Sequence, residues 1–247
     1  MKRLKRMLKR GLFAALRHSG VAGLYRRIMQ RKKATIILFH EMNHEQSQVV
    51  YSALYKYYNF ISLENLVAAI ESNSWEQIPN YALVVTLDDG RRSNLSASAF
   101  AENGVEAINF VSSSPDRLDG QKFVTESELS ELGKLFDIQS HTHSHPNLSQ
   151  LSKTMQLEEI RKNIDFLHSR KAGMIKYVAF PYGQYNQDSV DACKELGVRA
   201  SLTVDSGFVD ADSDLYRLKR LCLPNSFSES ELLVKVSGLW NFLQRKH

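Results

Sequence analysis

Cysteine, glycine and proline are scarce in this chain, and long apolar runs are absent. Two cysteines, Cys193 and Cys222, are too few for a disulfide framework, so the sequence does not point to an oxidising compartment. Twelve glycines and five prolines among 247 residues exclude a collagen-like or low-complexity chain. No apolar run approaches the roughly 18 residues of a membrane-spanning helix. The composition is that of a globular protein, and the length suits one large domain.

Acidic residues are missing from the first part of the chain. Residues 1–33 contain twelve Lys or Arg and no Asp or Glu, whereas residues 34–247 hold 20 basic and 27 acidic residues, a net charge of −7. We therefore divide the chain into a basic arm, 1–33, and a folded body, 34–247. Because a nucleic-acid-binding domain carries its basic face on the body, no nucleic-acid partner is expected.

The arm has apolar residues at helical spacing between its cations. They are Leu4, Met7, Leu8, Leu12, Ala15 and Leu16, after which Gly20 ends the helix and a second helical stretch follows. A basic amphipathic helix is typical of docking on an anionic membrane surface or on a partner. Two alternatives are a helix packed on the body with a solvated basic face, and a removed signal peptide. The apolar stretch 12–16 is short for a signal peptide, so we expect a cytoplasmic or peripheral membrane location.

In the body, β-rich runs alternate with helical patterns. Strands are expected at 35–39, 81–87, 107–111, 136–139, 177–180, 198–204 and 218–223, and helices at 63–70, 94–103, 125–134, 155–170, 187–196 and from Ser228 through Trp240. This alternation predicts an α/β fold, an incomplete or distorted (β/α) barrel of seven to eight strands, with an open doubly wound sheet as the alternative. Neither GxGxxG nor GxxxxGK[ST] occurs, so nucleotide binding has no support.

Four polar clusters follow predicted strands, where a barrel of this type carries its active site. The first is Thr86-Leu87-Asp88-Asp89-Gly90, in which two carboxylates precede a turn. The second is Ser140 to Pro146, which holds three of the eight histidines. Two imidazoles four residues apart can bind one metal ion with a carboxylate from another strand. The others are Phe180-Pro181-Tyr182-Gly183 and His40, which alone are more typical of a rigid turn and a structural histidine.

These clusters resemble the motifs of the polysaccharide deacetylases, carbohydrate esterase family 4, also called the NodB-homology domain. Thr86–Gly90 resembles the family's T-F-D-D-G, His141-Thr142-His143-Ser144-His145-Pro146 its H-[ST]-x-x-H-P, and Pro181-Tyr182-Gly183 part of its R-x-P-Y-G. The motifs lie in the family's order within residues 34–224. The resemblance implies a NodB-like catalytic domain over residues 34–247.

The resemblance also implies roles for individual residues. Asp89, His141 and His145 would bind a divalent metal, with Zn²⁺ expected first and Co²⁺ or Ni²⁺ as alternatives. Asp88 would be the general base, and the backbone N–H of Tyr182 would help hold the oxyanion. Pro181 and Tyr182 would line the substrate site. His143, in the variable part of its motif, would orient other groups or contact substrate.

The chain departs from the family pattern at two places. Ala179 stands where the third motif usually has an Arg that steadies the base, and Arg220 is our candidate replacement. No Leu-x-His occurs near the C-terminus, but Leu38-Phe39-His40 has that pattern. It resembles the circularly permuted branch that includes biofilm-polysaccharide deacetylases, which makes His40 the candidate general acid.

The sequence thus predicts a metal-dependent deacetylase of N-acetylhexosamine units in a bacterial polysaccharide or lipid-linked glycan. Residues 1–33 would reach an anionic membrane or membrane-bound glycan-synthesis machinery. One alternative is a metallohydrolase of the amidohydrolase or PHP type that uses His141 and His143 as an HxH pair. The other is a non-catalytic glycan-binding relic, suggested by Ala179.

Overall fold

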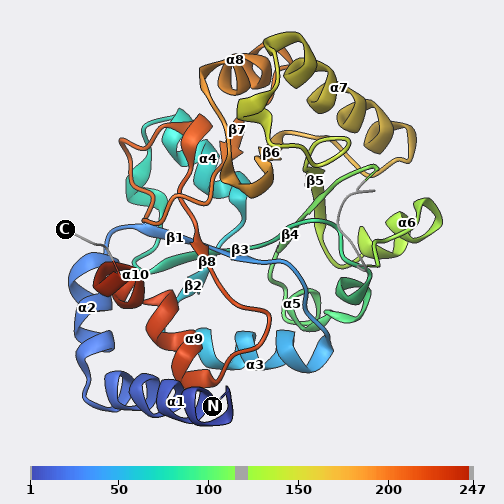
Figure 1. Ribbon diagram of the computed structural model, residues 1–247. Coiled ribbons are helices and arrows are strands. Elements are labelled where there is room, and N and C mark those ends of the chain that lie inside the picture. Colours follow the sequence, from blue (N-terminus) through green and yellow to red (C-terminus); the bar gives the residue numbers. More distant parts are fainter. Residues whose placement is uncertain (1, 115–121, 245–247) are drawn as a thin grey trace.

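Within the described residues, 2–114 and 122–244, the computed structural model shows eight strands in one parallel sheet. The strands are β1 (Ala34–Phe39), β2 (Asn59–Phe60), β3 (Ala82–Leu87), β4 (Ile108–Val111), β5 (Asp137–Ser140), β6 (Tyr177–Ala179), β7 (Ala200–Leu202) and β8 (Leu221–Cys222). Their order is β7-β6-β5-β4-β3-β1-β8, and β2 pairs separately with β3. The sheet curls so that its two edges approach, where Leu202 bridges Leu218 (Figure 1). The predicted incomplete (β/α) barrel is confirmed.

Helices surround this sheet (Figure 1). They are α1 (Lys2–His18), α2 (Val21–Met29), α3 (His44–Leu54), α4 (Leu63–Glu71), α5 (Ala99–Glu102), α6 (Leu129–Leu132), α7 (Lys153–Ser169), α8 (Gln187–Glu195), α9 (Glu229–Val236) and α10 (Leu239–Gln244). Every residue of β1 and β3 is buried, because the barrel interior covers one face of these strands and helices cover the other. The first and last strands, β1 and β8, are neighbours.

The helix predicted at 94–103 is wrong in its first half. The structure has a 3₁₀ turn at Arg92–Ser96 and then the short helix α5. The cause is Asn94, whose fully buried side chain accepts a hydrogen bond from the Met42 backbone N–H and donates one to the His40 carbonyl. These contacts hold the segment against the loop after β1, so a regular α-helix does not form there.

The predicted C-terminal helix is two helices, α9 and α10, because Gly238 between them adopts a positive φ of 79°. Ser228 caps α9 through the Glu231 backbone N–H, as predicted. The reciprocal contact of a capping box is absent there, since the Glu231 carboxylate binds Lys9 and Lys235 instead. Thr125 and Glu128 form a reciprocal capping box, but the segment predicted as a helix at 125–134 is a 3₁₀ turn, Glu126–Glu128, followed by the short helix α6.

Two elements were not predicted, α3 and β2. A signal for α3 was present, since Asn43 and Gln46 form a reciprocal capping box at its start. β2 is two residues long and has no pattern that a sequence could show.

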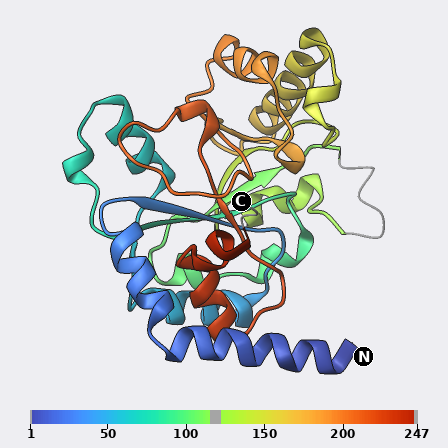
Figure 2. The same ribbon diagram turned by 60° about the vertical axis from the view of Figure 1, so that its left-hand side comes forward.

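The arm consists of α1 and α2, separated at Gly20 as predicted, and it packs along α9 and α10 (Figures 1 and 2). In α1 the structure describes side chains only from residue 7 onward, so the side chain of Leu4 lies outside the described part. Among the described residues, no helix has the length and apolarity needed to cross a membrane.

Candidate active site

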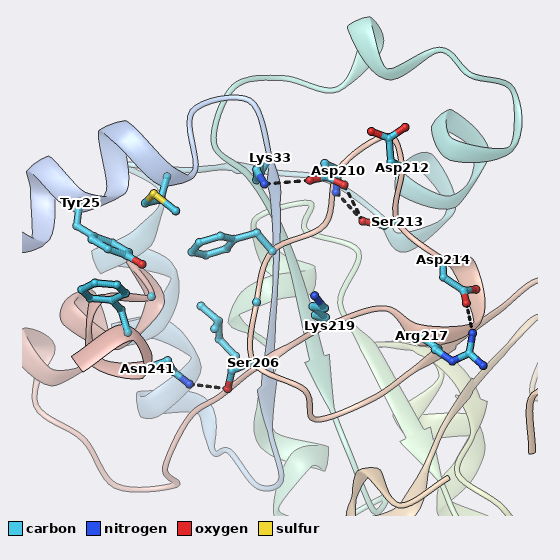
Figure 3. A pocket seen from close by; sticks show the side chains of 16 residues that line it. Tyr25, Lys33, Ser206, Asp210, Asp212, Ser213, Asp214, Arg217, Lys219 and Asn241 are labelled. Atoms are coloured by element: carbon cyan, nitrogen blue, oxygen red, sulfur yellow. Dashed lines mark hydrogen bonds and ion pairs between the residues drawn. The ribbon is translucent and has the colours of Figure 1, made fainter. Parts of the chain in front are cut away.

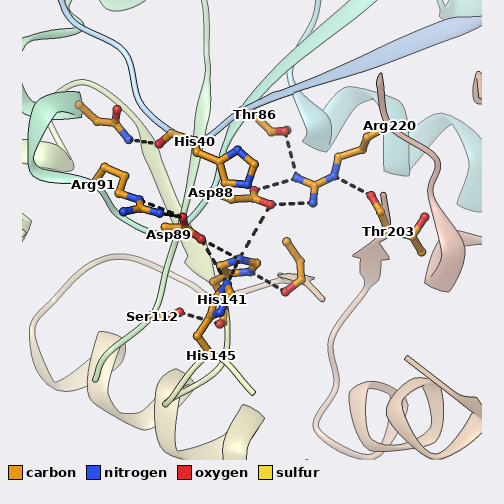
Figure 4. A network of polar contacts seen from close by, with 12 residues as sticks. His40, Thr86, Asp88, Asp89, Arg91, Ser112, His141, His145, Thr203 and Arg220 are labelled. Atoms are coloured by element: carbon orange, nitrogen blue, oxygen red, sulfur yellow. Dashed lines mark hydrogen bonds and ion pairs between the residues drawn. The ribbon is translucent and has the colours of Figure 1, made fainter. Parts of the chain in front are cut away.

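Polar side chains from five strand ends meet at one edge of the barrel (Figure 4). His40 follows β1, Asp88 and Asp89 follow β3, and Arg220 directly precedes β8. His141 and His145 follow β5, and a 3₁₀ turn at Pro181–Gly183 follows β6. These side chains therefore gather at the end of the barrel where this architecture is expected to have its active site.

Unusual backbone angles allow the two adjacent aspartates to converge. Asp89 has a φ of 73° and Gly90 a φ of 70°, in the left-handed region that side chains other than glycine rarely adopt. A Cβ atom at Gly90 would lie 2.9 Å from Cγ1 of Val111, so this position requires glycine. His145 has a similar φ of 56°. Backbone strain of this kind concentrates at functional sites.

Asp89, His141 and His145 form a compact group of metal-ligand atoms. Oδ1 of Asp89 lies 3.4 Å from Nε2 of His141 and 3.2 Å from Nε2 of His145, and all three residues are buried. The Nδ1–H of His141 donates to the Ala179 carbonyl, which turns the Nε2 lone pair toward the group. Nitrogen and carboxylate oxygen donors in a three-ligand set fit a divalent ion such as zinc.

The electrostatics of this group favour a cation at its centre. Burial alone would raise the pKa of Asp89, but hydrogen bonds with His141 and His145 hold it far below its ordinary value. Burial would lower the pKa of His141, but the charges of Asp88 and Asp89 raise it above its ordinary value. Burial, together with the charge of His141, lowers the pKa of His145. The group therefore stabilises positive charge between its three side chains.

Asp88 is held by a buried arginine. Nη1 and Nη2 of Arg220 donate to Oδ1 and Oδ2 of Asp88, both at 2.8 Å, and Arg220 is fully buried. Nε of Arg220 donates to the Thr203 carbonyl, so the guanidinium is fixed at both ends. The bidentate pair orients the Asp88 carboxylate beside the metal-ligand group, with Oδ2 3.9 Å from Nε2 of His141. Arg220 thus makes the contact with Asp88 for which the sequence analysis named it as the candidate replacement of the third-motif arginine.

Arg91 is a site residue that the sequence analysis missed. Its Nε and Nη2 donate to Oδ2 of Asp89 at 2.9 and 2.7 Å, which leaves Oδ1 facing the histidines. Its guanidinium also lies over the ring of Phe123. The sequence signal available for this pairing was a cation directly after the Asp-Asp-Gly turn.

The remaining predicted residues divide into two groups. His40 lies beside Asp88 in Figure 4, and its charge contributes to lowering the pKa of Asp89. Tyr182, about half exposed, packs the edge of its ring against His145 at a centroid distance of 4.6 Å, directly after the buried Pro181. His143, in contrast, lies apart from the metal-ligand group, because its Nδ1 pairs with the hydroxyl of Ser113.

A separate cavity of about 480 Å³ lies between α2, α10 and the loop after β7 (Figure 3). Four of its charged side chains form two ion pairs, Lys33 with Asp210 and Arg217 with Asp214. None of the metal-ligand residues lines it. We therefore place the candidate chemistry at the strand ends and not in this cavity.

The fold and the site define an α/β barrel protein with a three-ligand metal-type site. The profile of the family described as polysaccharide deacetylase matches residues 77–201, just over half of the chain. The chain belongs to this family.

Two curated relatives show how far the similarity extends. A poly-beta-1,6-N-acetyl-D-glucosamine N-deacetylase of Staphylococcus epidermidis is 30% identical over 111 residues, which are 42% of this chain and 38% of the relative. An enzyme of the same name from Staphylococcus aureus is 24% identical over 116 residues, 43% of this chain and 40% of the relative. The matches thus span well under half the length of these relatives.

Two solved structures share the fold. The Streptococcus pyogenes deacetylase PplD has a TM-score of 0.69 at 22% identity, covering 83% of this chain and 98% of that one. IcaB from Ammonifex degensii has a TM-score of 0.71 at 15% identity, covering 85% and 98%. The predicted NodB-like fold is therefore confirmed.

Proposed function

We propose that this protein is a metal-dependent hydrolase that removes N-acetyl groups from N-acetylhexosamine units of a bacterial polysaccharide or lipid-linked glycan. The observation that carries the proposal is the Asp88 carboxylate, held by Arg220 next to the group of Asp89, His141 and His145. Family membership and relatives named as N-acetylglucosamine deacetylases support the choice of substrate class.

The three ligand residues fit a divalent ion, with Zn²⁺ expected first and Co²⁺ or Ni²⁺ as alternatives. When bound, such an ion lowers the pKa of a water molecule and polarises a carbonyl oxygen. Asp88, acceptor-only and fixed by Arg220, then takes the proton of the attacking water. Arg91 keeps Oδ2 of Asp89 occupied, so that Oδ1 remains directed at the histidines.

Two further groups complete the proposed reaction. The backbone N–H of Tyr182, in the turn Pro181–Gly183 after β6, helps hold the oxyanion, and the packing of the Tyr182 ring against His145 places this turn at the site. His40, at the end of β1 beside Asp88, delivers a proton to the departing amine as the general acid (Figure 4). Pro181 and the ring of Tyr182 form the wall against which the sugar binds, and His143 supports the loop after β5 through Ser113.

The geometry favours this proposal over the two alternatives. An HxH metallohydrolase would need His143 at the metal, but His143 is bonded to Ser113 while His145 lies with His141. A non-catalytic relic was suggested by the Ala179 departure, but Arg220 supplies the missing contact to the base.

The proposal includes a location. We propose that residues 1–33 bring this activity to its glycan at an anionic membrane surface or at membrane-bound glycan-synthesis machinery, with the protein cytoplasmic or peripheral to the membrane. The concentration of cations in the arm supports it.

Acetate release from a panel of N-acetylated oligosaccharides tests the function. We expect release that a chelator abolishes and added Zn²⁺ restores, and that His141→Ala eliminates together with bound metal. Stoichiometric metal in His141→Ala would remove that residue from the ligand set. Absence of release from every glycan by the metal-loaded protein would favour the relic.

A further inference from the structure

The two N-terminal helices turn an apolar side toward solvent. Six residues form this side, which we call the outer apolar face: Met7, Leu8 and Leu12 on α1, and Val21, Leu24 and Ile28 on α2. Their exposed fractions range from 46% at Val21 to 69% at Ile28. Val21, Leu24 and Ile28 are spaced i, i+3, i+7 and therefore share one side of α2. Large apolar side chains that are so exposed on two consecutive helices indicate an interaction surface.

The opposite side of α1 is held to the body, in part by cations. Lys9 binds Glu231 and Arg17 binds Glu229, both on α9. Phe13, fully buried, packs against Trp240 with a ring-centroid distance of 4.7 Å. An amphipathic surface helix normally buries its apolar stripe and exposes its charges. In α1, Met7, Leu8 and Leu12 are exposed while Lys9 and Arg17 bind the body, so this apolar side of the helix has no partner among the described residues.

Unpaired cations accompany the outer apolar face. Arg10, Arg27, Arg31 and Lys32 are exposed and form no ion pair with any described residue. Residues 1–33 contain no acidic side chain that could neutralise them. The neighbouring helix α10 adds Phe242 and Leu243, both more than half exposed, and Phe242 contacts the ring of Tyr25 on α2. The surface thus combines exposed apolar side chains with cations that have no acidic partner among the described residues.

We propose that this surface of α1, α2 and α10 docks on an anionic lipid bilayer, with the outer apolar face inserted among the lipids and the cations at the headgroups. The positive charge of this surface favours anionic lipid over a second copy of the chain, because a second copy would bring like charges together. No described helix could span the bilayer, so the protein lies on its surface. This inference is independent of the proposed catalysis, since it uses none of the site residues.

Point substitutions are better suited to the test than removal of the arm, because Phe13 and Gln30 in the arm are fully buried. The face variant is Leu8→Gln, Leu24→Gln and Ile28→Gln. The matched control carries Val49→Gln, Met155→Gln and Met174→Gln, three apolar residues of comparable exposure elsewhere on the surface. The charge variant is Arg10→Gln, Arg27→Gln and Arg31→Gln. Co-sedimentation of the full chain is measured with phosphatidylcholine vesicles, with and without phosphatidylglycerol, at low and high salt.

We expect the wild type and the control to bind the vesicles that contain phosphatidylglycerol and to be released by salt. The face variant should bind at least about tenfold more weakly. The charge variant should bind about 100-fold more weakly, since each of the three cations it removes contributes roughly fivefold to the affinity for an anionic surface. Wild-type failure to bind anionic vesicles, or unchanged binding of the face variant, would overturn the proposal. So would a wild-type dimer in sedimentation that the face variant dissociates, since a second copy would then cover the face.

Discussion

Asp88 and Asp89 are neighbours in the chain but have different partners. Asp88 is paired with Arg220, and Asp89 faces the two histidines. Asp88→Asn should therefore retain the metal and lose about 10²-fold or more of the rate, as expected for a lost general base. Asp89→Asn should lose the metal. Metal content and acetate release, measured on both variants, check the assignment, and the reverse pattern would exchange the two roles.

Arg220 and Asp88 form a buried ion pair, and removing either side chain leaves the other charge buried without a partner. Arg220→Leu should lower the free energy of unfolding by about 3–5 kcal/mol. Adding Asp88→Asn should restore part of this loss, because the unpaired carboxylate is then gone. Urea denaturation of the two single variants and the double variant measures the coupling. Additive losses would show that the pair does not interact as the contacts indicate.

The proposed role of His40 as general acid predicts different kinetics for different leaving groups. A general acid contributes about 10²–10⁴-fold when the leaving group is poor, as an amine is. An aryl acetate needs no such proton. His40→Ala should therefore impair N-deacetylation strongly, spare aryl acetate hydrolysis and leave metal content unchanged. Equal losses on the two substrates, or none, would exclude His40 as the acid.

The N-terminal helices are attached through a small apolar cluster centred on Phe13, Ala22, Val234 and Leu239. Phe13→Ala should destabilise this attachment by about 3–5 kcal/mol, because it removes a buried aromatic ring. We expect faster amide exchange and faster tryptic cleavage in α1, with deacetylation of soluble oligosaccharides unchanged. Leu12→Ala, at a largely exposed neighbour, is the control and should alter neither. Equal protection of α1 in both variants would contradict this account.

The sequence predicted those elements whose causes lie in neighbouring residues, and it failed where distant residues determine the structure. Apart from β2, the strands coincide with the predicted runs, and Ser62, Thr125 and Ser228 cap the helical segments that begin after them. The helix at 94–103 was wrong because the hydrogen bonds of Asn94 join segments about 50 residues apart. In the site, motif positions indicated Asp89, His141 and His145. The contact of Arg220 with Asp88 joins residues 132 positions apart, and it depends on three-dimensional packing that no spacing encodes.

At the end of the barrel opposite the candidate site, a network of ion pairs connects one helix to two strands. Glu64 on α4 binds Lys176 and Arg199 and accepts a hydrogen bond from Tyr177, so these contacts link α4 to β6 and to the start of β7. Hydrogen bonds from Lys176 and Arg199 lower the pKa of Glu64 to about 2 from its ordinary 4.5. A lowered folded-state pKa stabilises the fold above the ordinary value, and this contribution is lost as pH falls from 4.5 toward 2.

Thermal unfolding against pH tests this contribution. At neutral pH, Glu64→Gln should lower Tm by about 2 °C, a modest value because the pair is partly exposed to solvent. The difference from wild type should shrink as the pH approaches 2. Glu131→Gln, which removes an exposed ion pair with Lys134, should show no comparable trend. A Glu64→Gln difference that is constant with pH would contradict the network's role.

Arg220 also occupies the place where the two edges of the curled sheet meet. It donates to the Thr203 carbonyl just beyond β7, precedes β8 directly, and holds Asp88 after β3. Backbone hydrogen bonds around Leu202 and Leu218, and one from Arg220 to the Asp205 carbonyl, accompany it there. Opening of this seam would release Asp88, the proposed general base, before the rest of the barrel unfolds. Heat inactivation of the protein would then precede its global unfolding, and the contacts of Arg220 would set its working temperature.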